Sequence, residues 1–582
     1  MKLIDALKLA ALPIEEGAPE KKVFLACGFT PLHLQTFLTA GLRTTFPAHQ
    51  VSSKTGLFGD LCGSIERLQL QPDTYDLLIV VVEWSDLDPR LGLRMLGGWR
   101  PSQMAEIVES AARTGSRLQS GILAASRQIP TIVSLPTLPL PPMFPTIPSQ
   151  TSSTEIQLRH TAMSLAASLV QEKDVRVANG QYLDEISSPD TRYDMKSDAM
   201  TGFPYSLNHA AGVAEVLCRL VDSSRQKKGL ITDLDDTLWS GILGEDGHDE
   251  ISWHLAQHSQ LHGLYQQFLA SLAGAGVLIG VASKNDSSNV EHAFERTDLL
   301  VSKSDIFPFE THWSSKSESV QRILRIWNIG PESVVFVDDS PMEVAEVKAA
   351  FPEMDCIVFP KNDYPGAWKL LRYLRELFGK PALTEEDALR LRSIRDSKVW
   401  RDARDISSKV SEDDFLESVQ AHVVFEPVHS RNGARAFELL NKTNQFNLNG
   451  KRLAASDWAS LFNNSGTLIL AVSYTDKFGA MGKIAVIMGS VRGRVAVVTG
   501  WVISCRAFSR RIEHQCLKYL FDTFDVDEIV FDYQSTPRNT VLQEFLVELF
   551  GELPKDEVRL SRELFVAKAP RLFHNVQGVA HV

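Results

Sequence analysis

The chain has 582 residues, 44% of them hydrophobic, so it is long and apolar enough to form several domains with their own cores. Its formal net charge of −12 at pH 7 gives no basic surface, so we expect no nucleic-acid partner. No apolar run of about 18 residues occurs, and the first residues lack the apolar core of a signal peptide, which predicts a cytoplasmic protein without a membrane span. The six cysteines lack metal-type spacing, as expected in a reducing compartment.

Residues 21–220 alternate between strand-like and helical patterns. The apolar, β-branched stretches that predict strands are 23–26, 77–83, 131–135 and 175–178, and helical patterns lie around 32–42, 102–117 and 153–171. Such alternation predicts a parallel sheet with helices on both faces. The proline-rich residues 136–148 predict a stiff loop rather than an element.

The order of these elements resembles an SGNH-hydrolase-like domain. The resemblance implies a nucleophile after the first strand, but residues 27–30 (CGFT) contain no serine. Residues 182–209 contain no Asp-x-x-His pair. We therefore expect residues 1–222 to form a degenerate, non-catalytic domain. Its polar stretch Glu83–Arg90 predicts either a binding edge or a turn packed on the next domain.

The next domain begins with the most informative stretch of the chain, residues 227–247 (KKGLITDLDDTLWSGILGEDG). Its short apolar run, Gly229–Thr232, predicts a buried strand that leads into Asp233, Asp235 and Asp236. Ligands of an open α/β sheet bind outside the carboxyl ends of the strands. Three carboxylates so close together repel one another unless a cation or a proton relieves the charge. The stretch is therefore either an acidic turn or part of a ligand site.

Two further predicted strands, residues 278–282 and 334–337, also end in polar residues. The first is followed by Ser283-Lys284-Asn285 and the second by Asp338-Asp339. Lys316 opens a helical pattern between them. In this order and at these positions, the polar groups resemble the four motifs of the haloacid dehalogenase (HAD) superfamily.

The resemblance implies the chemistry of the site. Asp233 would attack phosphorus to form an aspartyl-phosphate, and Asp235 would protonate the leaving oxygen and then deprotonate water. The residues expected to bind phosphate oxygens are Thr237, Ser283, Lys284, Asn285 and Lys316. Those expected to hold Mg²⁺ are Asp233, Asp235 through its backbone carbonyl, Asp338 and Asp339. Lys316 could instead begin a solvated helix, and Ser283 could be a helix N-cap.

This second domain, residues 223–384, has little room for a cap. Proteins of the superfamily insert specificity domains after the first motif or between the second and third. About fifty residues separate Asp233 from Ser283, and about thirty separate Ser283 from Lys316, which suffices only for the required helix and strand. We therefore expect an open site that accepts a phosphate on an extended or macromolecular substrate. The glycine-rich, polar residues 239–247 predict a small flap rather than core.

Residues 385–582 are expected to form a linker and a third domain. The charge-rich residues 385–414 predict helices with a solvated face. Strand-like stretches follow at 423–428, 467–474, 483–488, 495–504 and 528–533, with helical patterns at 434–440, 508–523 and 540–551. This order resembles the GNAT acyltransferase fold, although residues 505–511 (CRAFSRR) lack the glycines of its pyrophosphate cradle. Without these glycines, the sequence does not decide whether the third domain binds CoA.

Several segments together resemble one branch of the HAD superfamily, the FkbH-like proteins. They are residues 233–247, 283–286 and 336–341 (FVDDSP), with 443–448 (TNQFNL) and 501–506 (WVISCR) in the third domain. Members of that branch take the glyceryl group of 1,3-bisphosphoglycerate, remove its phosphate and load it as a thioester on an acyl carrier protein for polyketide-type biosynthesis. The resemblance implies a phosphorylated small-molecule donor and an acyl carrier protein as partners here.

Transfer to a thiol needs a second nucleophile, and Cys505 lies at a predicted strand end and helix start. The helix N-terminus and Arg506, Arg510 and Arg511 would lower the pKa of its thiol toward the reactive thiolate. Cys505 could instead be a small buried hydrophobe. Residues 443–448 could contact the acyl group or act as a capping segment.

The sequence thus predicts a three-domain, Mg²⁺-dependent phosphatase and acyl transferase. The expected fold class is α/β, with a HAD Rossmann-like parallel sheet flanked by an SGNH-like α/β domain and a GNAT-like α+β domain. Two alternatives stay open: a phosphatase or phosphotransferase acting on another phosphoester, such as a sugar phosphate, and a non-catalytic platform that docks a carrier protein. The presence of Asp233, Asp235, Lys316 and Asp338 argues against the platform.

Overall fold

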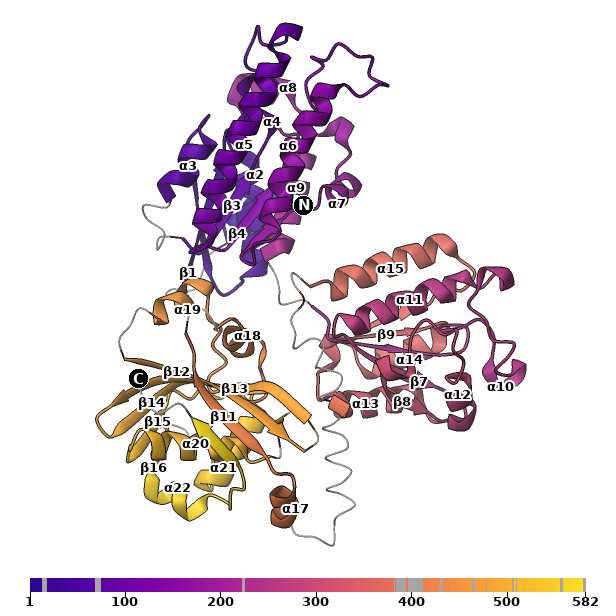
Figure 1. The fold of residues 1–582 in the computed structure, drawn as a ribbon, viewed down its shortest axis with the longest axis vertical. Coiled ribbons are helices and arrows are strands. Elements are labelled where there is room, and N and C mark those ends of the chain that lie inside the picture. The colour runs from indigo at the N-terminus through magenta and orange to yellow at the C-terminus, as the bar shows by residue number, and fades with distance from the viewer. Residues whose placement is uncertain are drawn as a thin grey trace. The chain divides into compact units, whose positions relative to one another are not determined.

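The computed structural model contains three β-sheets in the part of the chain that it describes (Figure 1). The described residues are 1–12, 18–68, 75–221, 226–380, 383, 394–395, 412–429, 433–462, 466–477, 479–504, 507–508, 510–554 and 558–578. The chain divides into two compact units, Met1–Ser224 with Ala454–Ser460, and Arg225–Leu453 with Leu461–Val582. The predicted domain boundaries near residues 222 and 384 lie outside the described residues.

The first sheet has five parallel strands in the order β2-β1-β3-β4-β5. The strands are β1 (Glu20–Cys27), β2 (Gln50–Thr55), β3 (Leu77–Val81), β4 (Thr131–Ser134) and β5 (Val175–Val177). The helices are α1 (Leu3–Ala10), α2 (Leu32–Thr45), α3 (Leu61–Leu68), α4 (Trp84–Leu87), α5 (Met104–Ser126), α6 (Ser153–Leu169), α7 (Gly180–Ile186), α8 (Met195–Thr201) and α9 (Leu207–Val221). The predicted parallel sheet is confirmed. Its edge strand β2 (QVSSKT) was not predicted, because only Val51 of that strand is buried.

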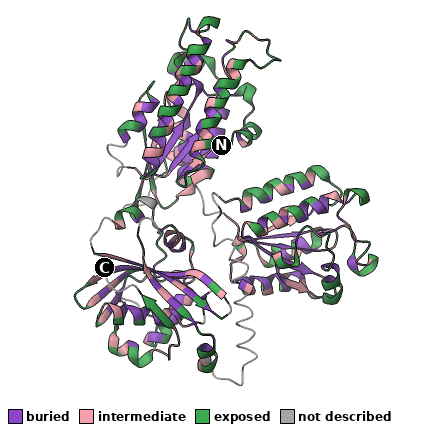
Figure 2. Cartoon of the chain, viewed as in Figure 1, coloured by how far each residue is buried: buried purple, intermediate pink, exposed green. Residues whose placement is uncertain are grey.

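The five buried residues of β3 (LLIVV) point alternately to the two faces of this sheet and contribute to a hydrophobic core on each face (Figure 2). Leu78 and Val80 join a hydrophobic cluster with α3, α5 and α6, whereas Leu77, Ile79 and Val81 join one with α2 and α9. Successive strand residues point to opposite faces, so an unbroken apolar run is what a strand covered on both sides requires.

An aspartate fills the place at the carboxyl end of β1 where the SGNH resemblance implies a nucleophile. The Asp86 carboxylate accepts hydrogen bonds from the backbone N–H of Glu83, at 2.8 Å, and from that of Gly28. A Cβ on Gly28 would lie 1.8 Å from Asp86 Oδ1, so the close approach requires glycine. Burial raises the pKa of Asp86 to about 7.

The polar stretch Glu83–Arg90 has a structural role inside this domain, which neither sequence interpretation included. Glu83 is 2% exposed, and its carboxylate accepts hydrogen bonds from the Thr137 hydroxyl (2.6 Å) and the Tyr205 hydroxyl (2.7 Å). The Trp84 indole N–H donates to the Leu138 carbonyl at 2.8 Å. These contacts tie the loop after β3 to the loop after β4.

The second sheet also has five parallel strands, in the order β10-β9-β6-β7-β8. The strands are β6 (Gly229–Thr232), β7 (Leu278–Ser283), β8 (Ile306–Thr311), β9 (Val334–Asp338) and β10 (Asp355–Val358). The helices are α10 (Leu243–Asp246), α11 (Gln260–Gly274), α12 (Ser287–Ala293), α13 (Lys316–Trp327), α14 (Pro341–Ala350) and α15 (Tyr364–Phe378). Helices α11 and α15 cover one face, and α13 and α14 cover the other (Figure 1). Within residues 226–380, no separate cap domain interrupts this alternation.

The predicted flap after β6 is partly core. Trp239 and Leu243 are 0% and 3% exposed and belong to the hydrophobic cluster under α11 and α15, so the expectation that residues 239–247 lie outside the core is wrong for these two. Ser240 pairs with Ser252 through two backbone hydrogen bonds, which folds the segment back onto the domain. Ile242, at 42% exposed, projects from it.

The third sheet has seven strands in the order β16-β15-β14-β13-β12-β11-β17. The strands are β11 (His422–Pro427), β12 (Thr467–Asp476), β13 (Gly479–Arg492), β14 (Val495–Ile503), β15 (Glu528–Phe531), β16 (Val558–Ser561) and β17 (Asn575–Gly578). The helices of residues 412–568 are α17 (Glu412–Ser418), α18 (Ala434–Lys442), α19 (Ala455–Leu461), α20 (Ile512–Thr523), α21 (Thr540–Phe550) and α22 (Arg562–Lys568). The predicted antiparallel order of β12, β13 and β14 is confirmed, and β14 then pairs in parallel with β15. The predicted linker helices of residues 385–414 fall mostly outside the described residues.

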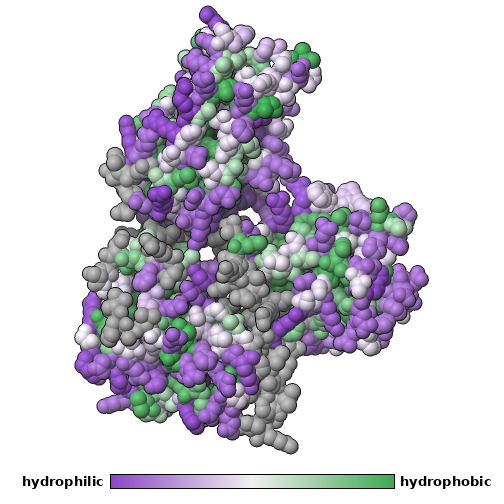
Figure 3. Space-filling model, viewed as in Figure 1, coloured by the Kyte–Doolittle hydropathy of each residue, from purple (hydrophilic) through white to green (hydrophobic). Residues whose placement is uncertain are grey.

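No helix among the described residues is both long enough and apolar enough to cross a bilayer. The face drawn in Figure 3 carries mainly hydrophilic side chains, with hydrophobic ones scattered among them.

The Gly28→Ala substitution should destabilise the first domain, because the added Cβ displaces the Asp86 carboxylate from its two backbone donors. We expect a loss of about 1–3 kcal/mol, the usual cost of forcing atoms into a packed site, seen by calorimetry of the full chain as a lower unfolding midpoint. Gly180→Ala is the matched control, since a Cβ there meets nothing within 4 Å. Equal effects of the two substitutions would contradict the close approach.

Candidate active site

Polar side chains from three strand ends meet at the carboxyl edge of the second sheet. The central strand β6 lies between β9 and β7, so parallel pairing places Asp233, Asp338 and Ser283 at one edge. The backbone N–H of Asp233 donates to the Val337 carbonyl at 3.0 Å, which continues the pairing with β9. The ends of three apolar strands thus position the first, second and fourth sequence motifs together.

The third motif enters from α13, whose first residue is Lys316. This lysine is 3% exposed, so the alternative of a solvated helix start is wrong. Its ammonium lies 2.7 Å from Asp233 Oδ1 and 2.9 Å from Asp338 Oδ2, and it donates to the Ala282 carbonyl at 2.8 Å. Burial acts to lower the pKa of Lys316, but the two carboxylates outweigh it and raise that pKa.

Asp338 is the most buried of the acidic groups, at 0% exposed. Its Oδ1 accepts from the backbone N–H of Ser340 at 2.9 Å, while Oδ2 faces Lys316. Burial and the neighbouring Asp233 charge raise the pKa of Asp338 to about 6, against the opposing effect of Lys316. A second positive charge near these two carboxylates would therefore stabilise their ionised forms.

The Asp235 carboxylate makes a separate set of hydrogen bonds. Oδ1 accepts from Trp239 Nε1 (2.9 Å) and from the Leu243 backbone N–H (3.1 Å), and Oδ2 accepts from Asn285 Nδ2 (2.9 Å). Burial raises the pKa of Asp235, although these three hydrogen bonds oppose it. A carboxyl group that holds its proton more tightly than usual, two residues from a carboxylate nucleophile, suits general acid chemistry.

Ser283 and Asn285, two of the predicted phosphate-binding residues, lie beside Asp235. They are 2% and 4% exposed, and Asn285 Nδ2 donates to the Ser283 hydroxyl at 3.1 Å. The N-cap of α12 is Asp286, so the alternative of Ser283 as a helix N-cap is wrong. The Ser283 hydroxyl keeps its own proton for another acceptor, as a phosphate-binding group requires.

Thr237 and Lys284, also predicted to bind phosphate, bond to the loops and helices around the site. Thr237 is 0% exposed, and its hydroxyl accepts from the Asp339 backbone N–H at 3.0 Å, tying the loop after β6 to the loop after β9. Lys284 pairs with Glu343 of α14 at 2.7 Å. Their predicted contact with phosphate stays a prediction.

Three of the four predicted metal ligands come together. Carboxylate oxygens of Asp233, Asp338 and Asp339 all lie within 4.8 Å of one another. The Asp235 side chain is engaged elsewhere, which leaves only its backbone carbonyl as the predicted ligand. An all-oxygen set with high negative charge suits a hard divalent cation such as Mg²⁺. These residues therefore fit the cation that the resemblance implies.

The sequence interpretation missed one member of the site, Lys361. Its ammonium lies 2.9 Å from Asp236 Oδ2 and 2.8 Å from Asp339 Oδ2. Lys361 follows β10, which was not predicted as a strand, so its place at the same sheet edge could not be inferred. The available signal was Cys356-Ile357-Val358, a short apolar run after α14.

The predicted second nucleophile, Cys505, lies outside the described residues, as does Arg506. Arg510 is 2% exposed, with its Nε 3.6 Å from Asp476 Oδ2, and Arg511 pairs with Asp413 at 2.8 Å. The charges of these two arginines are thus balanced by carboxylates, which weakens the argument that they lower the pKa of the Cys505 thiol.

Residues 443–448 pack against the end of β14. The Leu448 N–H donates to the Trp501 carbonyl at 2.9 Å, and the Ile503 N–H donates to the Phe446 carbonyl at 3.1 Å. Asn447 is 3% exposed, and its amide group bonds to the backbone of Thr443 and Gly450. These contacts favour the capping interpretation for Asn447 and bring residues 446–448 beside residues 501–503.

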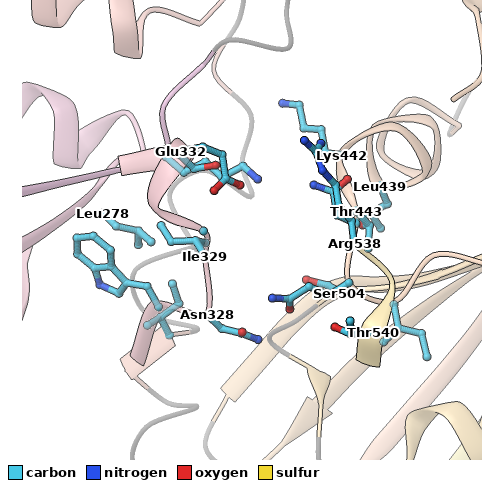
Figure 4. A pocket seen from close by; sticks show the side chains of 18 of the residues that line it. Leu278, Asn328, Ile329, Glu332, Leu439, Lys442, Thr443, Ser504, Arg538 and Thr540 are labelled. Carbon is cyan, nitrogen blue, oxygen red and sulfur yellow. The ribbon is translucent and has the colours of Figure 1, made fainter. Parts of the chain in front are cut away.

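A pocket is lined in part by Ile503 and Ser504, at the end of β14 (Figure 4). Its lining in the third domain includes the end of α18, the end of β14 and the start of α21, with the side chains of Leu439, Lys442, Thr443, Ser504, Arg538 and Thr540. The three carboxylates of the predicted metal site are not part of this lining. The acidic site and this pocket are therefore different places on the chain.

Comparison with known proteins supports the fold. No family model and no curated protein matches the chain. Among solved structures, the N-terminal part of the protein BF1531 from Bacteroides fragilis, which contains a phosphatase domain complexed with Mg, matches with a TM-score of 0.50 and 19% identity. That match covers 66% of this chain and 100% of the other.

Two weaker matches each cover 34% of this chain. The lipase Lip_vut3 from a goat rumen metagenome has a TM-score of 0.24 and 12% identity over 95% of its chain. The salicylyl-acyltransferase SsfX3 from a tetracycline biosynthetic pathway has a TM-score of 0.22 and 14% identity over 54% of its chain. The sheets and the BF1531 match together confirm the expected α/β fold class, with a parallel sheet in the second domain.

Asp338 and Asp339 should differ in their effect on a divalent cation. Asp338→Ala removes a fully buried carboxylate and should abolish Mg²⁺-dependent activity. Asp339→Ala should weaken Mg²⁺ binding about 10–100-fold, the usual effect of removing a residue that orients the metal ligands. Activity titrated against Mg²⁺ measures both, and circular dichroism checks that each variant folds. A larger loss in Asp339→Ala would reverse the assignment.

Proposed function

We propose that this chain is a Mg²⁺-dependent HAD-type enzyme that removes a phosphate group through Asp233. The observation that carries the proposal is the buried contact of Lys316 with both Asp233 and Asp338, at 2.7 and 2.9 Å, with Asp235 two residues further along the chain from Asp233. In a non-catalytic protein, two buried carboxylates and a buried lysine would add little to the stability of the fold, because removing such charges from water is costly. A phosphoryl-transfer site needs them.

The reaction has two steps. A carboxylate oxygen of Asp233 attacks phosphorus, the bond from phosphorus to the substrate oxygen breaks, and Asp235 gives its proton to that leaving oxygen. Asp235, now ionised, takes a proton from water, whose oxygen attacks the aspartyl-phosphate and releases inorganic phosphate and the free Asp233 carboxylate. A bound Mg²⁺ supplies charge neutralisation at the phosphoryl oxygens. Lys316 and Ser283 hold two of those oxygens.

The substrate that we propose is a bisphosphoglycerate-like donor. A bisphosphoglycerate-like donor carries a phosphoester, which Asp233 would hydrolyse, and an acyl phosphate. Attack by the Cys505 thiolate on the acyl carbon expels that second phosphate and leaves a thioester, which exchanges onto the thiol of an acyl carrier protein. The FkbH-like segments and the lack of a cap domain within residues 226–380 support this reading.

The Asp233→Asn variant should lose phosphate release by about 10³-fold or more, because an amide keeps the shape of the nucleophile without its charge. Release of phosphate from an aryl phosphate in Mg²⁺ measures it. Asp249→Asn removes an exposed carboxylate of the same domain and should leave the rate unchanged. More than a tenth of the wild-type rate in Asp233→Asn would exclude this nucleophile.

The Cys505→Ala variant separates the two halves of the proposal. It should abolish acyl loading of a carrier protein, read by intact mass after incubation with 1,3-bisphosphoglycerate, but keep phosphate release from an aryl phosphate. Cys356→Ala, in β10, is the control thiol and should leave loading intact. Loading that persists without Cys505 refutes its role, and a wild-type chain that never loads a carrier points to a phosphatase acting on another phosphoester.

A further inference from the structure

Lys361 connects two acidic loops of the second domain. Its ammonium lies 2.9 Å from Asp236 Oδ2 and 2.8 Å from Asp339 Oδ2. Asp236 follows the nucleophile strand β6, and Asp339 follows β9 and belongs to the predicted metal ligands. One side chain thus joins the ends of three strands, β10, β6 and β9.

The Asp236 end of this contact is the base of the segment that folds back after β6. Asp236 has a positive φ of 50°, and its Oδ1 accepts from the Gly241 backbone N–H at 3.0 Å. The Asp236 N–H in turn donates to the Gly241 carbonyl at 3.3 Å. Lys361 holds the other oxygen of this carboxylate, so it fixes a tight loop whose next residues include Trp239 and Leu243, the donors to Asp235.

The Asp339 end of the contact places a fixed positive charge beside the acidic cluster. Of the two carboxylate oxygens of Asp339, Oδ2 accepts the hydrogen bond from Lys361, at 2.8 Å. A lysine ammonium is positively charged at physiological pH, so this charge is present beside the cluster. A positive charge at this distance from a carboxylate repels any divalent cation bound to the same group.

We propose that Lys361 is a positioning residue that holds the affinity of the acidic cluster for a divalent cation below its electrostatic maximum and keeps the loop after β6 in place. The inference rests on the metal site in the proposed function. When no cation is bound, Lys361 offsets the repulsion between Asp236 and Asp339. When one is bound, the lysine opposes it and favours its release.

Calorimetric titration of the full chain with Mg²⁺ alone, without substrate, tests this role. Lys361→Met keeps most of the side-chain stem but removes the charge, and should bind Mg²⁺ about tenfold more tightly, since a unit charge a few ångströms from a divalent ion acts at this scale in partly hydrated surroundings. Lys361→Arg keeps the charge and should stay close to wild type. Lys369→Met removes an exposed lysine of α15 and should change nothing.

A second readout separates positioning from simple structural support. Without Mg²⁺, Lys361→Met should unfold at a lower temperature than wild type, and saturating Mg²⁺ should raise its midpoint by more than it raises the wild-type midpoint. In turnover, the Mg²⁺ concentration for half-maximal activity should fall while kcat also falls, because the donors to Asp235 lose their anchor.

Two outcomes would overturn the inference in different ways. Equal or weaker Mg²⁺ binding by Lys361→Met, with the wild type binding normally, would overturn the role of Lys361 and leave the metal site standing. No Mg²⁺ binding by the wild type would overturn the metal site itself, and this inference with it.

Discussion

The ammonium group of Lys316 sits between two buried carboxylates, and the geometry of the second domain depends on that contact. A lysine that is 3% exposed is tolerated only because Asp233, Asp338 and the Ala282 carbonyl compensate its loss of water. The contact fixes the start of α13 over the ends of β6, β7 and β9. It also sets the position of the proposed nucleophile, and removing Lys316 would leave the two buried carboxylates without its positive charge.

The central strands and their polar ends could be predicted because they are unbroken apolar runs that stop abruptly at charged residues. Strands β6, β7 and β9 are buried along their whole length, which gave Asp233, Ser283 and Asp338 their places. The edge strands β2, β8 and β10 were missed, because their residues are only partly buried and partly polar. Lys361 was lost with β10, since a residue has no predicted neighbours until its strand is recognised.

The direction in which each side chain points could not be predicted from the sequence either. Residue type and spacing placed Thr237 and Lys284 near the site, but not their partners, Asp339 and Glu343. In the third domain the strand order was predictable from alternation and glycine turns, whereas the balanced charges of Arg510 and Arg511 were not. Their partners, Asp476 and Asp413, lie far away in the sequence, and local sequence carries no information on such pairs.

The Asp86 carboxylate beside Gly28 limits how the first domain could be engineered into a hydrolase. An esterase needs free backbone N–H groups to receive the oxyanion of a tetrahedral intermediate. Here the N–H groups of Gly28 and Glu83 already donate to a resident carboxylate of this chain. Placing a serine after β1 would therefore not by itself supply such donors, because these two N–H groups already serve the Asp86 side chain, which is covalently part of the protein and does not leave.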